Sequence, residues 1–192
     1  EMPSLNPGGD NKEAKYEMKT EGMAIFKDLQ FVGYAGKFDT EVYNVLINNA
    51  RVVLVELFEE GDLVSLTLSK PKSDIKVSKN GEQIDVDIKV SGEMSLSNFF
   101  VEGNSDENYK DRVKEVKKVA NEFLAQKTTE SIKNIMLLGS DIYGFGRALH
   151  NSNPSDWREV SQDWENYFKN ANVKVEYNLV LSREGEINTP FI

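Results

Sequence analysis

The chain has 192 residues, of which 39% are hydrophobic and 29% are charged, and it contains one histidine and no cysteine. Its 23 basic and 32 acidic residues give a formal net charge of -9, which disfavours binding to nucleic acid or broadly to an anionic membrane because both attract concentrated positive charge. The lack of cysteine excludes disulfides, thiol catalysis and cysteine-ligated metals. No apolar run approaches the roughly 18 residues that a membrane-spanning helix needs.

The length suits one large domain, or one domain with a small appendage. Residues 1–14 contain two prolines, two glycines and little apolar mass. We expect them to form a flexible lead-in, because they cannot bury enough surface to offset the entropy lost on ordering. Residues 15–192 are expected to form a single domain.

The first half of this domain has the patterns of β-structure. Asp39 is a suitable N-cap for a short helix between two groups of strands. Pro71 marks a bend or a strand edge, and Asn80-Gly81 is a strong signal for a tight hairpin turn. The predicted strands are residues 15–26, 31–34, 51–59, 63–68, 74–77 and 84–90, the last with a clean alternation of apolar and polar side chains.

The spacing of apolar residues becomes helical after residue 105. In residues 105–138, apolar side chains recur at steps of three and four with lysines and glutamates on the opposite face. This pattern predicts a long amphipathic helix, with a candidate break at residues 127–129 and an end at Gly139.

A second helix is predicted to begin at Asn153-Pro154, since Asn can cap a helix and Pro suits its first turn. The alternation over residues 173–181 predicts a final long strand that ends by Gly185. On the second helix, one face would carry Trp157, Val160, Trp164, Tyr167 and Phe168.

The order of these elements is strands, then helices, then a strand, without regular βαβ alternation. This order predicts the α+β class: an antiparallel or mixed β-sheet covered by a long helix and a Trp-rich helix.

The sequence lacks the common motifs of catalysis and cofactor binding. It has neither a P-loop nor a GxSxG nucleophile elbow, and Gly144-Phe145-Gly146 has only two of the three glycines of a dinucleotide fingerprint. His150 is the only imidazole, which excludes metal triads of histidine, and its place at a helix end favours packing or capping over general-base catalysis. Carboxylates are plentiful, but no pair stands out. We therefore predict no catalytic residue, no cofactor and no metal ligand.

The most informative segment is residues 140–168, in which residues 141–146 mix aromatic residues with glycines. A stripe of tryptophans at helical spacing is more often core than a platform for stacking a ligand, and the glycines require a sharp bend or a close approach of the backbone. As a candidate interaction or fold-defining segment we single out Asp141, Tyr143, Gly144, Phe145, Gly146, His150, Trp157, Trp164 and Phe168.

This segment resembles the C-terminal region of spore germination proteins of the Ger(x)C type, the C subunits of nutrient germinant receptors. The residues that carry the resemblance are Asp141-Ile142-Tyr143-Gly144-Phe145-Gly146, Leu149-His150, Pro154, Trp157, Trp164 and Phe168. It extends back through Gly22-Met23-Ala24-Ile25-Phe26-Lys27 and Val32-Gly33-Tyr34, and forward to Arg183-Glu184-Gly185. It covers the chain from about Lys15 to its end.

The resemblance implies a C-terminal fragment of a non-enzymatic receptor lipoprotein that serves assembly or signalling in nutrient-triggered germination. It implies a parent protein with a signal sequence and a lipid-modified, palmitate-bearing cysteine outside this sequence, anchored to the outer face of the inner spore membrane. The implied partners are the membrane-embedded A and B subunits of the receptor. The family brings no catalytic residues to transfer.

The residues alone are also compatible with a different class of function. The chain would then be a soluble carboxylate-based hydrolase or a small-ligand binding module, with a pocket beside Trp157 and Trp164. A deep apolar pocket with convergent carboxylates at that place would favour this alternative.

Overall fold

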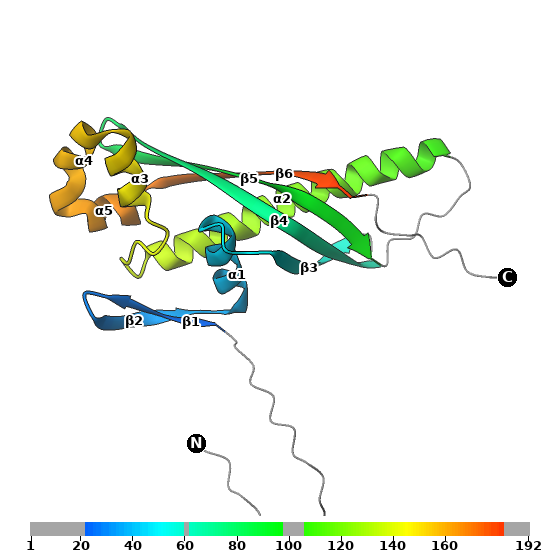
Figure 1. Ribbon diagram of the computed structural model, residues 1–192, viewed down its shortest axis with the longest axis horizontal. Coiled ribbons are helices and arrows are strands. Elements are labelled where there is room, and N and C mark those ends of the chain that lie inside the picture. Colours follow the sequence, from blue (N-terminus) through cyan, green and yellow to red (C-terminus); the bar gives the residue numbers. More distant parts are fainter. Residues whose placement is uncertain (1–21, 60–61, 98–105, 183–192) are drawn as a thin grey trace, which may run out of the picture.

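A computed structural model describes residues 22–59, 62–97 and 106–182, and the fold is α+β (Figure 1). A four-stranded sheet has the order β3-β4-β5-β6, and a separate hairpin pairs β1 with β2. The strands are β1 (Met23–Lys27), β2 (Gln30–Ala35), β3 (Val52–Glu59), β4 (Asp62–Asn80), β5 (Gln83–Ser97) and β6 (Asn172–Leu181). The helices are α1 (Lys37–Leu46), α2 (Asp106–Met136), α3 (Phe145–Ser152), α4 (Pro154–Val160) and α5 (Trp164–Lys169), with a 3₁₀ turn η1 (Ser161–Asp163).

The four-stranded sheet is mixed. Strands β3, β4 and β5 are antiparallel neighbours, whereas β6 runs parallel to β5. A parallel neighbour needs a long crossover connection, which the helices between β5 and β6 supply. The predicted α+β class with an antiparallel or mixed sheet is confirmed.

One face of the sheet is the core and the other faces solvent. In β5 the alternation is nearly complete, since Ile84, Val86, Ile88 and Val90 are buried while Asp87 and Lys89 are exposed. Helix α2 runs along the sheet (Figure 1) and contributes an apolar stripe to the core. The buried apolar residues of α2 are Val116, Ala120, Leu124, Ile132, Ile135 and Met136.

The break predicted in the long helix at residues 127–129 is wrong. Helix α2 is continuous through this stretch. The buried Thr128 hydroxyl lies 3.0 Å from the Tyr177 hydroxyl of β6, so its polar group is satisfied inside the core. Thr129 donates a hydrogen bond of 2.7 Å to the Ala125 carbonyl, which lets a hydroxyl residue sit within the helix.

The N-terminal hairpin and the short helix after it differ from prediction in their starts. Of the strand predicted over residues 15–26, residues 15–21 lie outside the described residues, and β1 begins at Met23. Helix α1 begins at Lys37 after the N-cap Gly36, so Asp39 lies inside the first turn and is not the N-cap. Its carboxylate instead accepts a hydrogen bond of 3.2 Å from the Gly36 amide, and this reach back over three residues still satisfies a free N–H at the helix start.

Strand β4 contains the predicted irregularity at Pro71. Its register to β5 shifts between Ser69 and Lys72, and Lys70 has a φ of 49°, a conformation that side chains with a Cβ seldom adopt. At the far end of β4, Asn80 pairs with Gln83, so the two-residue turn is Gly81-Glu82. The turn therefore lies one residue later than predicted, with Gly81 at a φ of 62°.

The predicted Trp-rich helix is two short helices. Helix α4 ends at Val160 and α5 begins at Trp164, with the 3₁₀ turn η1 between them. The predicted start is confirmed, because the Asn153 side chain accepts a hydrogen bond from the Asp156 amide and Pro154 is the first helical residue. Helices α3, α4 and α5 gather at the end of the sheet where β4 turns into β5 (Figure 1). Among the described helices, none combines the length and apolar character needed to cross a membrane.

Candidate functional site

Asp141 organises the turn between α2 and α3. Its Oδ1 accepts hydrogen bonds of 2.9 Å from both the Gly144 and Phe145 amides, and its Oδ2 accepts one of 2.7 Å from the Gly146 amide. The indole Nε1 of Trp164 donates a fourth bond of 3.1 Å to Oδ2. The first amides of a helix lack partners within it and carry partial positive charge, so one carboxylate both caps α3 and ties it to α5.

Two glycines let the backbone take this shape. Gly144, the N-cap of α3, has a φ of 77°, a left-handed conformation that glycine adopts without strain. Gly146 lies beneath the tryptophans: an added Cβ would be 2.9 Å from Trp164 Nε1 and 3.0 Å from the Trp157 ring. The two glycines thus serve a helix start and close packing.

The aromatic residues form one connected cluster. Ring centroids are 5.3 Å apart for Tyr143 and Phe145, 6.1 Å for Phe145 and Phe168, and 5.2 Å for Trp157 and Trp164. Phe145 and Phe168 are buried, while both tryptophans are half-buried. Burial raises the pKa of the Tyr143 hydroxyl above its ordinary value. The cluster closes the core at this end of the sheet.

His150 lies on the exposed face of α3, and its ring centroid is 6.0 Å from that of Trp157. The structure brings together all nine residues singled out in the segment, with Asp141 and Gly144 in the turn, Gly146 in the first turn of α3 and the aromatic side chains around them.

An ion-pair network that the sequence did not point to joins β1 to α5. The Glu165 carboxylate accepts hydrogen bonds from the ammonium groups of Lys27 and Lys169, the latter at 2.8 Å. These bonds and the charges of the two lysines lower the pKa of Glu165 to about 2. The Ser140 hydroxyl adds a bond of 2.9 Å to the Phe26 carbonyl, so the hairpin is held against the candidate segment.

Replacing Glu165 by Gln is expected to lower the free energy of unfolding at neutral pH. A carboxyl group whose pKa is lower in the folded state than in the unfolded state stabilises the fold above the unfolded value near 4.5. That contribution is lost as pH falls toward about 2, so the difference between wild type and variant should shrink over this range and also shrink with added salt.

Urea unfolding at a series of pH values measures this difference. The matched control is Glu176→Gln, which removes an exposed carboxylate of β6 without touching either lysine. A wild type-to-variant difference that stays constant between neutral pH and pH 2 would contradict the assignment.

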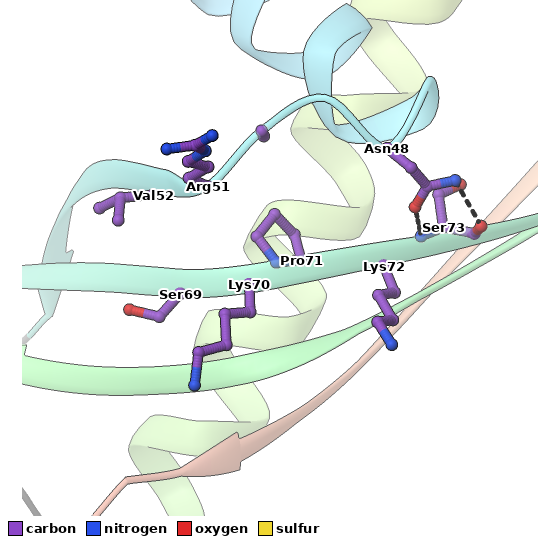
Figure 2. A pocket seen from close by; sticks show the side chains of 9 residues that line it. Asn48, Arg51, Val52, Ser69, Lys70, Pro71, Lys72 and Ser73 are labelled. Carbon is purple, nitrogen blue, oxygen red and sulfur yellow. Dashed lines mark hydrogen bonds between the residues drawn. The ribbon is translucent and has the colours of Figure 1, made fainter.

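Two grooves stand out on the described part of the chain, and neither is beside the tryptophans. The larger, of about 780 Å³, lies between the α1–β3 loop and β4 (Figure 2). It is lined by Asn48, Ala50, Arg51, Val52, Ser69, Lys70, Pro71, Lys72 and Ser73. The smaller, of about 350 Å³, lies on α2 and is lined by Lys114, Lys117, Lys118, Asn121 and Glu122. The hydrolase alternative requires a pair of carboxylates in its pocket, and neither lining holds one.

Sequence reasoning did not find the larger groove. Its walls come from residues 48–52 and 69–73, two segments about twenty residues apart in the sequence. Neither segment contains a motif, and the only prediction there was a bend or strand edge at Pro71. Within the described residues, no group of three or more histidine, aspartate or glutamate side chains is placed to hold a metal ion.

Comparison with known proteins gives consistent results. The family model "Spore germination B3/GerAC like, C-terminal" matches residues 21–185. The spore germination protein YndF of Bacillus subtilis (strain 168) is 23% identical over 183 residues, which are 90% of this chain and 43% of YndF. The crystal structure of the GerBC protein has the same fold, with a TM-score of 0.66 and 16% identity over 87% of this chain and 53% of that one. The chain thus spans about half the length of these two proteins.

Proposed function

Since the chain belongs to the family of GerAC-like C-terminal domains of spore germination proteins, we propose that it is a non-enzymatic domain that serves assembly or signalling in a nutrient germinant receptor. The observation that carries this proposal is the extent of the family match, which covers residues 21–185 and so includes the sheet, α2 and the candidate segment. The proposed partners are the membrane-embedded A and B subunits. The proposed location is the outer face of the inner spore membrane, reached through a lipid anchor outside this sequence.

The candidate segment offers a surface for such contacts. Its interior side is occupied by the Asp141 cap and the aromatic cluster, whereas Arg147, His150 and Arg158 are exposed on α3 and α4. Two short helices held on a rigid turn present these side chains at fixed positions, and fixed positions lower the entropy lost when a partner binds. We therefore assign the buried members of the segment a fold-defining role and the exposed ones a role in contact.

The test is charge reversal on the exposed side, with Arg147→Glu and Arg158→Glu combined in the full-length protein in spores. The expected result is reduced co-purification with the A and B subunits and slower nutrient-triggered germination, with an unchanged melting temperature of the purified domain. The control is Lys117→Glu with Lys118→Glu, which changes charge equally on α2.

Two outcomes distinguish the contact surface on α3 and α4 from the function of the whole domain. Wild-type assembly and germination in the α3–α4 variant would remove this surface as a contact. Wild-type behaviour after deletion of the entire domain would overturn the proposed function itself.

A further inference from the structure

The larger groove lies where the α1–β3 loop runs along β4, beside the residues of β4 that follow its pairing with β3. The Asn48 side-chain amide pairs with both backbone groups of Ser73, donating to its carbonyl at 3.1 Å and accepting from its amide at 2.8 Å. At the other end, the Lys70 amide donates a hydrogen bond of 2.8 Å to the Arg51 carbonyl. The α1–β3 loop is therefore fixed along β4 at both ends of the groove, as Figure 2 shows for the Asn48–Ser73 pair.

The backbone of β4 at the groove is held in a conformation that costs energy. Lys70 has a φ of 49°, whereas the φ of 59° at Asn48 is ordinary for an asparagine just after the end of a helix. A left-handed lysine persists only where the surrounding structure enforces it, and such residues concentrate at sites of ligand or partner binding.

The rims of the groove are positively charged in a protein whose net charge is -9. Arg51 stands on the loop side, while Lys70 and Lys72 extend from β4 away from the loop (Figure 2). Arg51 and Lys72 form no ion pair with any residue of the described part of the chain, and Lys70 approaches only Glu93, at 3.9 Å between exposed groups. No carboxylate lines the groove.

The surface between these charges is apolar. Pro71 is buried beneath the groove, and Val52 is 58% exposed at its mouth. Val52 begins β3, an edge strand of the sheet, and Leu54 on the same face of β3 is 70% exposed. Among the described strands β3 has no neighbour on its outer side, so an extended segment can pair with its backbone groups there.

We propose that this groove binds an extended acidic segment of a partner protein. The cations stand on opposite rims and do not converge on one point, so they suit several carboxylates spaced along a chain better than a single small anion. In an extended segment alternate side chains share one side, so apolar residues can face Val52 and Pro71 while the carboxylates between them lie at the mouth of the groove, where the flexible side chains of the three cations can meet them. A broad anionic membrane is disfavoured because the remaining surface, with its net negative charge, would be repelled.

This inference rests on the proposed function, since a receptor complex is where such a partner would be met. Its first test is titration of the isotope-labelled chain with a short peptide of alternating glutamate and valine, followed by amide chemical shifts. The expected result is saturable shifts confined to residues 48–54 and 69–73, which weaken with added salt because the contacts are ionic. Two control peptides should bind more weakly: one alternates lysine with valine and so lacks the negative charges, and the other alternates glutamate with serine and so lacks the apolar side chains.

The variant Arg51→Glu, Lys70→Glu and Lys72→Glu is expected to weaken binding of the glutamate–valine peptide by about tenfold or more, because like charges then face each other across the groove. The matched control is Lys114→Glu, Lys117→Glu and Lys118→Glu, which reverses three charges at the smaller groove and should bind as wild type does. Equal losses in both variants, or shifts spread over the whole surface, would overturn the proposal.

Two further outcomes would replace the proposed occupant. Sedimentation with phosphatidylglycerol vesicles that depends on the same three cations would indicate a lipid surface, and concentration-dependent dimerisation lost in the groove variant would indicate a second copy of this chain. In spores, wild-type receptor assembly in the groove variant combined with failure after domain deletion would overturn this inference and leave the proposed function standing.

Discussion

Replacement of Asp141 by Ala is expected to lower the free energy of unfolding by about 3 kcal/mol. The substitution removes the common acceptor of three backbone amides and the Trp164 indole. A hydrogen bond to a charged group contributes about 1.5–3 kcal/mol. The expected loss is smaller than four times that contribution because Asp141 is half-buried, so water can form hydrogen bonds with some of the amides that lose their acceptor. Urea unfolding followed by tryptophan fluorescence measures the change.

Two companion variants make the interpretation specific. Asp141→Asn keeps one acceptor oxygen and should cost roughly half as much, whereas Asp87→Ala, which removes an exposed carboxylate of β5, should change stability by less than about 0.5 kcal/mol. If Asp141→Ala were as stable as wild type, the carboxylate would not be what holds α3 in place. A wild-type stability of Asp141→Ala would also mean that the hydrogen bond from Trp164 does not fix α5 against the start of α3.

Regular periodicity made most of the sheet and the long helix predictable. Residues 84–90 alternate because one face of β5 meets the core and the other meets water, and this pattern needs no knowledge of the partner strands. The start of α4 was equally readable, since Asn153 and Pro154 act within their own turn. These features depend on residues close together in the sequence.

Features built from distant residues were not predictable. The parallel pairing of β6 with β5 depends on where the helices return the chain, which no local pattern records. Asp141 was singled out only as part of a motif: its cap on α3 is local, but the tie to α5 depends on an indole 23 residues away. The larger groove depends on the contact of residues 48–52 with residues 69–73 and on the unusual backbone of Lys70, and lysine by itself gives no signal for a left-handed conformation.

The aromatic cluster should be the most sensitive part of the domain. Phe145 is 0% exposed and packs between Tyr143 and Phe168, with ring centroids at 5.3 and 6.1 Å. Phe145→Ala is expected to lower the free energy of unfolding by about 3–5 kcal/mol, through lost burial and the cavity left behind. Phe145→Leu fills most of that space and should cost about 1.5 kcal/mol or less.

The control for this series is Phe31→Ala on the hairpin, where the residue is 49% exposed and its ring contacts those of the exposed Phe26 and Tyr34, so less buried apolar surface is lost than at Phe145. The Phe145 amide also donates a hydrogen bond to Asp141, so the effects of Asp141→Ala and Phe145→Ala should not be additive. The double variant should lose less stability than the sum of the two single variants. Strict additivity would mean that the carboxylate cap and the aromatic core hold α3 independently. Equal losses for Phe145→Ala and Phe31→Ala would show that the cluster is not a tightly packed part of the core, and the contact surface on α3 and α4 would then lack the rigid support that the proposed function requires.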